Sequence, residues 1–302
     1  MSLATIAAAS AVSRPPLLVP RFYRGNMCGV HVPQLPPIEG GPSDPTLVVS
    51  WIVFRYSASD RQRIYQVWRA KGFRDVLVSW PDARAAGLSI DAFVAHGAEL
   101  LDSGFLPAVM LCSKDFDRPD VGAILDSAIP VLRALIDQNV IARASIGWEL
   151  SLWLSPTQVQ QLIDAICAVT VPAGIRTYVH FQQGYSSFQQ PGGTFADFWN
   201  ANVGKLTGVF HQKIHEQTKE QYRGDSGGLE DVLVRFAGGF HVSPDSGFGH
   251  PFDLIALEIT AHQQFNGEFS EAQGDALALW ALDTPGVDGP LGRVVVMGSG
   301  NG

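Results

Sequence analysis

The run RDVLVSW, residues 74–80, indicates the fold of this chain, because apolar and β-branched residues follow one another without polar alternation. A strand with one face in water alternates, whereas a continuous run is typical of a strand covered on both faces in a parallel sheet. Seven more runs have this character: TLVVSWIVF (46–54), FLPAVML (105–111), RASIGWE (143–149), RTYVHF (176–181), LTGVFH (206–211), DLIALEI (253–259) and RVVVMG (293–298).

Helical patterns with recognisable starts separate these runs. A Ser followed three residues later by Gln predicts a capping box at a helix N-terminus. Three such pairs occur, at Ser59 and Gln62, at Ser155 and Gln158, and at Ser270 and Gln273. The pattern at 121–138 contains Pro130, which should kink or break its helix.

Alternation of strand and helix over about 250 residues predicts an α/β protein, a (β/α)8 barrel of the TIM type. A doubly wound open sheet is the alternative, but it predicts a Gly-rich fingerprint after the first strand. The segment FRYSASD (54–60), which follows the first predicted strand, has no glycine.

The predicted barrel covers residues 46–302, with a long insertion at 212–252 that we expect to cover or flank its mouth. Residues 1–45 are rich in proline and predict an extended N-terminal arm. No eighth helix follows the run at 293–298. We therefore expect the arm or a partner chain to cover the gap between the last and first strands.

Composition excludes several classes of function. A net charge of −8 and a pI of about 5.4 argue against a nucleic-acid partner. The sequence has neither a membrane span nor a convincing signal peptide, which predicts a cytoplasmic protein unless it belongs to a larger particle. Cys28, Cys112 and Cys167 have no metal-binding spacing, and His211 and His215 lack the Glu of a zinc-protease helix. We expect no metal and no cofactor.

In such barrels, the active site lies where the strands end. The residues at these ends are aromatic, amide-bearing or charged, a lining that suits a polyhydroxylated ligand. The predicted ligand-binding residues are Arg55, Trp80, Asp82, Lys114, Trp148, Ser151, His180, Gln182, Tyr185, His211, Gln212 and His262.

Two carboxylates stand out at these ends. Glu149 ends the fourth predicted strand and Glu258 the seventh, each after apolar residues. Two carboxylates facing each other are what glycoside hydrolysis requires, one as acid/base and one as nucleophile. The alternative is that each forms a buried ion pair with a basic neighbour such as Arg55 or Lys114.

This arrangement resembles the clan A glycoside hydrolases, which are (β/α)8 barrels acting with retention. The resemblance implies that Glu149 is the acid/base and Glu258 the nucleophile. The sequence departs from the clan at two positions: Trp148 stands where the clan has Asn, and Met297 where the clan has a Trp on strand eight.

The segment RFYRGNMCGVHVPQLPPIEGGPSDPTLVVSW, residues 21–51, resembles the opening of virion-associated proteins of tailed bacteriophages. This resemblance implies a place on the phage particle, with other virion proteins bound through the arm and a bacterial surface glycan as ligand. Two other functions stay open: a non-catalytic structural or glycan-binding virion protein, and another barrel enzyme such as a lyase or an amidase.

Overall fold

The computed structural model describes residues 24–32, 35, 47–181, 195–211, 254–261, 285–286, 289–290 and 293–300. Its strands are β1 (Arg24–His31), β2 (Leu47–Val49), β3 (Phe73–Ser79), β4 (Leu106–Met110), β5 (Arg143–Ser145), β6 (Arg176–Phe181), β7 (Gly208–His211), β8 (Leu254–Ala261), β9 (Pro285–Gly286), β10 (Gly289–Pro290) and β11 (Arg293–Gly300). Its helices are α1 (Ala58–Ala70), α2 (Trp80–Ala85), α3 (Ile90–Asp102), α4 (Val121–Asp137), α5 (Pro156–Thr170) and α6 (Phe195–Ala201), with 3-10 turns η1 (Ser50–Arg55) and η2 (Leu150–Leu152).

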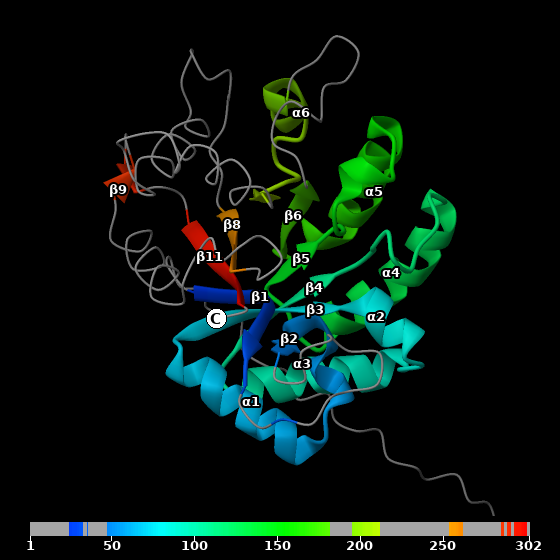
Figure 1. The fold of residues 1–302 in the computed structure, drawn as a ribbon. Helices are drawn as coiled ribbons and strands as arrows, with labels where there is room; N and C mark the ends of the chain where they lie inside the picture. Colours follow the sequence, from blue (N-terminus) through cyan, green and yellow to red (C-terminus); the bar gives the residue numbers. More distant parts are fainter. Residues whose placement is uncertain are drawn as a thin grey trace, which may run out of the picture.

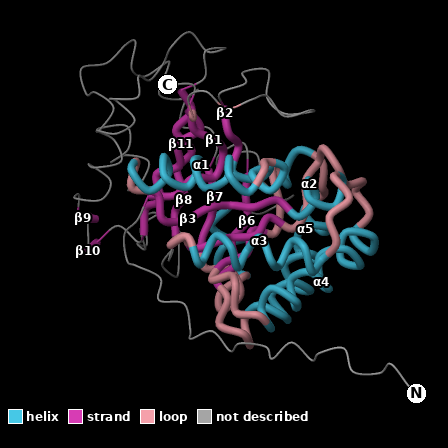
Figure 2. Tube along the Cα trace, turned by 90° about the horizontal axis from the view of Figure 1, so that it is seen from below, coloured by secondary structure: helices cyan, strands magenta, loops and turns pink. Residues whose placement is uncertain are grey.

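The chain is a mixed α/β protein built on a mainly parallel sheet. The strands pair in the order β11-β8-β7-β6-β5-β4-β3-β1-β2, and β11 also pairs with β1. The parallel pairings therefore run from β1 through β3 to β8 and β11 and return to β1. Figures 1 and 2 show α1, α3, α4 and α5 on the outside of these strands.

The first predicted strand is wrong. Of the described residues of this run, 47–54, only β2 is extended, and it pairs antiparallel with β1, while the chain from Ser50 to Arg55 forms η1. The parallel strand between β3 and β11 is β1, which lies within the predicted arm. Because β1 pairs in parallel on both sides, the N-terminal segment supplies a strand of the sheet. The rest of the arm, apart from residues 32 and 35, lies outside the described residues: 1–23, 33–34 and 36–45.

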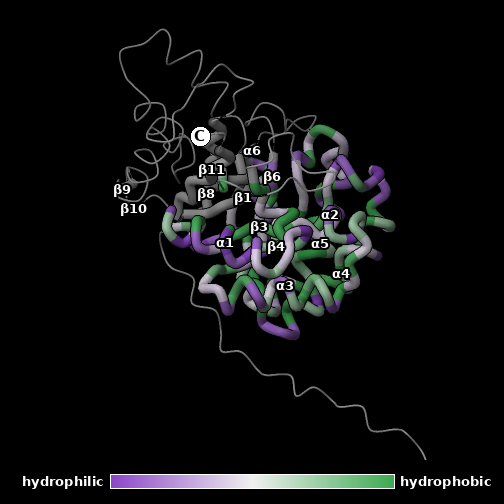
Figure 3. The backbone as a smooth tube through the Cα atoms, turned by 60° about the horizontal axis from the view of Figure 1, so that its bottom comes forward, coloured by the Kyte–Doolittle hydropathy of each residue, from purple (hydrophilic) through white to green (hydrophobic). Residues whose placement is uncertain are grey.

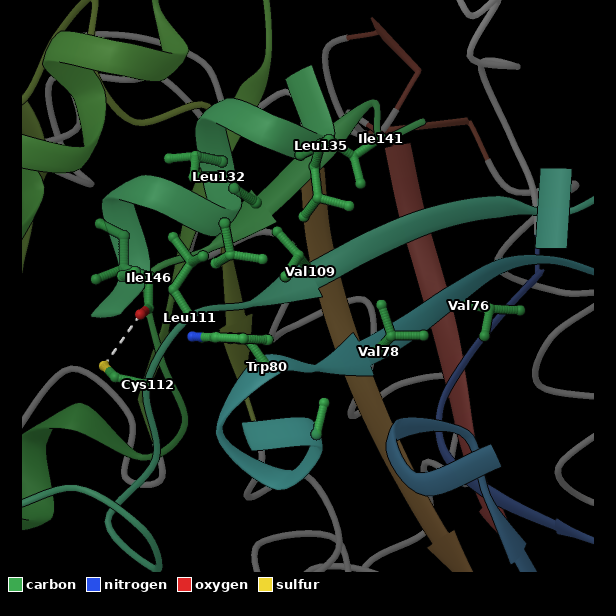
Figure 4. Packing of buried hydrophobic residues seen from close by; sticks show 14 of the residues in the cluster. Val76, Val78, Trp80, Val109, Leu111, Cys112, Leu132, Leu135, Ile141 and Ile146 are labelled. Carbon is green, nitrogen blue, oxygen red and sulfur yellow. Dashed lines mark hydrogen bonds between the residues drawn. The ribbon is translucent and has the colours of Figure 1, made fainter. Parts of the chain in front are cut away.

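Strands β3 and β4 are buried on both faces, as their apolar runs predict. Val76, Val78 and Val109 belong to the hydrophobic cluster under the helices, where Leu132 and Leu135 of α4 also lie (Figure 4). The alternating positions Leu77, Ala108 and Met110 are equally buried but lie outside that cluster. Figure 3 shows hydrophobic stretches along these strands and hydrophilic ones along α1.

A buried ion pair links alternate strands. Arg143 of β5 contacts Asp75 of β3, with β4 between the two strands. Tyr178 of β6 lies close by, and burial, together with the charge of Asp75, raises its pKa well above the ordinary value, against the opposing charge of Arg143. These three residues are at most 4% exposed, so they occupy an interior closed to solvent.

The helix starts agree only in part with the predictions. Ser155 and Gln158 form the predicted capping box of α5. The N-cap of α1 is Ser57 rather than Ser59, and its hydroxyl accepts a hydrogen bond from the Asp60 amide. Pro130 lies inside a continuous α4. Proline has no backbone N–H to donate to the carbonyl four residues earlier. Because Pro130 is on an exposed part of the helix, water can bond to that carbonyl instead.

Several predictions concern the other parts of the chain. The insertion at 212–252, the capping box at Ser270 and Gln273, and whatever follows β11 lie outside the described residues. No helix in the described part of the chain is both long enough and apolar enough to cross a bilayer.

Candidate functional site

Glu149 lies where the chain leaves β5 and turns into η2. The extended pairing continues past the strand, because the Trp148 amide donates to the Cys112 carbonyl at 2.9 Å and Trp148 bridges to Ser113. Glu149 itself has φ of 49° and ψ of 43°, the left-handed region that residues with a Cβ rarely adopt. A non-glycine residue held in this conformation at a strand end is a feature of functional sites.

The loop after β4 positions Lys114. It is a tight turn in which the amides of Phe116 and Asp117 donate to the Ser113 carbonyl, at 3.1 and 2.9 Å. The Asp117 carboxylate accepts from the Ser113 amide at 2.9 Å and pairs with Arg84 of α2 at 2.6 Å. These bonds fix the segment that carries Lys114 beside the turn at Glu149.

Lys114 and Glu149 form an ion pair. The ammonium of Lys114 contacts Oε2 of Glu149, and the two side chains are 35% and 4% exposed. A buried carboxylate needs such a partner, because its transfer from water to an apolar interior is costly. The predicted alternative, pairing with Lys114, is therefore confirmed for Glu149.

Aromatic rings lie against the same turn. The His180 imidazole stacks on Trp148, with centroids 4.0 Å apart and planes at 16°. Trp51 of η1 contacts Trp148 at a centroid distance of 4.8 Å. In addition, Nδ1 of His180 accepts a hydrogen bond of 2.7 Å from the Glu149 backbone amide. Trp148 is thus held between His180 of β6 and Trp51 of η1, and the Glu149 amide is held by His180.

Oε2 of Glu149 is occupied by the Lys114 ammonium. The buried hydroxyl of Ser151, at the same turn, has no hydrogen-bond partner within the described part of the chain. Buried polar groups are normally satisfied, so such a hydroxyl marks a place where a ligand or water can bind. We refer to Lys114, Trp148, Glu149, Ser151 and His180 as the strand-end site.

A second charged group lies at the ends of β3 and β4. Burial raises the pKa of Asp82, and the charge of Asp115 adds to that shift. The Ser79 hydroxyl and the charge of Arg55 oppose it. Two predicted ligand-binding residues, Arg55 and Asp82, are therefore close enough to interact, and their neighbour Asp115 directly follows Lys114.

Trp80 does not fit its predicted role. The residue is 5% exposed, and its ring packs against that of Phe93 of α3, with centroids 5.3 Å apart. Its indole N–H donates to the Ser127 hydroxyl of α4 at 2.9 Å. With its ring inside the helix layer and its N–H bonded, Trp80 is a core residue. The end of a strand does not ensure that a side chain reaches the site, because the chain enters α2 at Trp80 itself.

The structure describes the backbone of Glu258 in β8 and of His211 in β7, but not their side chains. Glu258 pairs in register with Met297 of β11. Gln182, Tyr185, Gln212 and His262 lie outside the described residues.

The described residues include no group of three or more His, Cys, Asp or Glu side chains arranged to hold a metal ion. Cys112 and Cys167 are free and buried. Burial raises the pKa of the Cys112 thiol well above its ordinary value, so this group is unreactive as a thiolate nucleophile.

Two residues at the site were missed by the sequence analysis. Trp51 stood inside a predicted strand, where an aromatic residue suggests core packing. Gly147 precedes Trp148, and a Cβ there would lie 2.6 Å from Leu150 Cδ2 and 2.9 Å from the Cys112 carbonyl. A glycine in a strand-like run can indicate such a close approach.

No known protein family matches the chain, and no curated protein matches it. Among solved structures, it is similar to 2,3-dimethylmalate lyase, a member of the PEP mutase/isocitrate lyase superfamily, with 12% identity over 77% of this chain and 71% of the other, and a TM-score of 0.40. Oxaloacetate acetylhydrolase gives 11% identity over 78% and 71%, with a TM-score of 0.38. A family 1 β-glucosidase from Thermotoga maritima gives 10% over 80% and 66%, with a TM-score of 0.28. At these scores, the function has to be inferred from the site.

Proposed function

We propose that the chain is a (β/α)8-type barrel that binds a glycan at the strand-end site and hydrolyses it with retention. Glu149 is the acid/base and Glu258 the nucleophile. The observation that carries the proposal is Glu149: a carboxylate at most 4% exposed, on a left-handed residue, whose buried Oε2 pairs with Lys114, a side chain that is 35% exposed.

The order of the strands supports the pairing of these two acids. Counted along the parallel series from β1, β5 is the fourth strand and β8 the seventh. The error in the first predicted strand leaves this count unchanged, because β1 replaces it. Phe210 of β7 pairs with both His180 and Ala256, and Glu258 is two positions beyond Ala256. Positions two apart on a strand share a face of the sheet, so the Glu258 position is on the face of the His180 position.

The chemistry divides between the two carboxyl groups. The first step requires Glu149 as the carboxylic acid: in that form it donates its proton to the glycosidic oxygen as the bond to the anomeric carbon breaks, and the Glu258 carboxylate attacks that carbon to form a glycosyl-enzyme. Glu149 then takes a proton from the water that displaces Glu258 and releases the sugar. The Ser151 hydroxyl and the Lys114 ammonium are available to sugar hydroxyls.

A second function is favoured by the Lys114 ion pair. A carboxylate whose buried oxygen is already occupied by an ammonium can serve as a binding group without turnover. In that case the protein is a non-catalytic glycan-binding barrel. In both cases we propose a bacterial surface glycan as ligand and a place on a phage particle, from the resemblance of residues 21–51.

The test is a panel of bacterial surface polysaccharides offered to the wild type, to Glu149→Gln and to Asp164→Asn. Asp164 is a matched control, since it is a carboxylate paired with a lysine, Lys205, on the exposed side of α5. Hydrolysis with retained configuration that is lost only in Glu149→Gln supports the glycosidase. Binding without turnover in the wild type supports the second function. Neither binding nor turnover with any polysaccharide contradicts both.

A further inference from the structure

His180 was predicted to bind the ligand, but its environment assigns it another role. It lies in β6, is 1% exposed and stacks on Trp148. Its Nδ1 faces the backbone amide of Glu149, not an open surface. A side chain so enclosed has little means of touching a glycan directly.

The hydrogen bond defines the protonation state of the ring. A backbone N–H is always a donor, so the nitrogen that it meets at 2.7 Å must offer a lone pair. A neutral imidazole has one acceptor nitrogen and one donor nitrogen, and an imidazolium has two donors. Nδ1 of His180 is therefore unprotonated, and the proton of the ring is on Nε2.

We infer that neutral His180, in its Nε2–H form, is the positioning residue that holds Glu149 in its left-handed conformation. The catalytic consequence depends on the function proposed above. A left-handed non-glycine residue is strained and persists only where its surroundings over-determine it. His180 constrains two consecutive residues. Its Nδ1 holds the amide of Glu149 through a hydrogen bond, and its ring holds the side chain of Trp148 by stacking.

The constraint directs the carboxylate. A residue released from the left-handed region turns its Cβ in a different direction, which would take the Glu149 carboxylate away from Lys114. The contact between these two groups exists because the turn has this geometry. His180 thus acts through Glu149, without touching the substrate.

Two substitutions separate the acceptor from the ring. His180→Asn places an amide oxygen close to the position of Nδ1, so it keeps an acceptor for the Glu149 amide while it removes the stacked ring. His180→Phe keeps an aromatic ring against Trp148 and removes the acceptor. Because the two variants remove complementary features, they show which one holds Glu149.

The first measurement uses the full-length wild type labelled with 15N in histidine. A long-range proton–nitrogen correlation spectrum reports which ring nitrogen carries the proton, and the His180 signals are those absent from His180→Asn. We expect an unprotonated Nδ1 and a protonated Nε2 at neutral pH. A proton on Nδ1 would overturn the inference. This readout requires no ligand and no folded variant other than His180→Asn.

The second measurement is hydrogen exchange at the Glu149 amide without ligand. Loss of one hydrogen bond corresponds to about a tenfold change, so exchange should be about tenfold faster in His180→Phe than in His180→Asn. Equal rates would overturn the inference. Turnover, where the wild type has it, should fall further in His180→Phe than in His180→Asn. If the wild type shows no turnover, the proposed function fails, while the ring proton and the exchange rates still decide the role of His180.

Discussion

Two ion pairs with a buried carboxylate lie in the β3–β5 region of this protein, and they differ in the exposure of the base. In the Asp75–Arg143 pair, the side chains of the acid and the base are 6% and 3% exposed. In the Lys114–Glu149 pair, the acid side chain is as buried, at 4%, but that of the base is 35% exposed. The first pair joins β3 to β5 across β4, and the second joins the loop after β4 to the turn after β5.

The exposure of the base decides what each pair can do. A ligand cannot reach Asp75 or Arg143 without opening the sheet, so that pair serves the fold. The Lys114 side chain is 35% exposed, so a ligand can approach this pair from the side of the base. A pair with one open member is therefore suited to binding, and substitutions can test this distinction through the free energy of unfolding.

The largest effect is expected for Asp75→Asn. It leaves the buried Arg143 guanidinium without its carboxylate, and arginine cannot shed its proton to become neutral. Breaking a buried pair in this way costs about 3–5 kcal/mol. Denaturation in urea, followed by tryptophan fluorescence, measures the loss. The control is Asp75→Asn combined with Arg143→Met, which should recover most of the stability because no charge stays buried. A loss below about 1 kcal/mol for Asp75→Asn would show that water reaches this pair.

Much of the fold was predictable because the strands are covered on both faces. The runs at 74–80 and 105–111 are apolar at most of their buried positions, and Asp75 and Ser79 are the buried polar exceptions. By contrast, β1 has the sequence RGNMCGVH, with two glycines and several polar residues. Nothing in this pattern indicates a central strand. The strand forms because β3 and β11 pair with it on both sides. The run at 46–54 looked more like a strand and forms mainly η1.

The site was predictable as a position but not as a geometry. One acid in an apolar run was sufficient to single out Glu149, and Lys114 was one of its two predicted partners. The role of His180 could not be predicted, since its bond to the Glu149 amide exists only with a left-handed backbone at that residue. Glutamate gives no sign of that conformation, whereas a glycine would have suggested it.

A second substitution tests how tightly the strand-end site is packed. In Gly147→Ala, the new methyl group would meet the Cys112 sulfur, and also Leu150 Cδ2 at 2.6 Å and the Cys112 carbonyl at 2.9 Å. The carbonyl belongs to the backbone and cannot move freely. We expect a loss of about 3 kcal/mol, the upper end for overpacking, in the same urea experiment. Cys112→Ala in the same chain should restore part of it. An unchanged urea midpoint for Gly147→Ala would mean that the chain around Gly147 can move to accept the methyl group, so that this turn is not tightly packed.

A buried group that has no ion pair within the described residues gives a third comparison. His96 of α3 is 6% exposed, and burial lowers its pKa from 6.5 to about 4, against the raising effect of Glu99. Between these values, the unfolded chain binds a proton that the native chain does not, so stability falls as the pH drops from about 6.5 towards 4. At pH 5 the loss should be about 2 kcal/mol. Urea midpoints at pH 7 and pH 5 measure it, and His96→Leu should lack this component. The same slope in His96→Leu would assign the acid sensitivity to other groups.

The smallest effect on stability is expected for Glu149→Gln, although it makes the same chemical change as Asp75→Asn. The substitution removes the charge partner of Lys114, but the Lys114 side chain is 35% exposed and can turn its ammonium to solvent. The amide nitrogen of the substituted side chain can donate where the carboxylate could not, which suits the neighbouring Ser151 hydroxyl. We expect a change of less than about 1 kcal/mol, the size found for exposed pairs, in either direction. The control is Asp164→Asn, which breaks an exposed pair with Lys205. Its change in the free energy of unfolding is the reference for a pair that has no role in a site. A loss for Glu149→Gln as large as that for Asp75→Asn would make the two pairs equivalent. The strand-end pair would then serve the fold, and the reason to assign Glu149 a function would disappear with the difference between them.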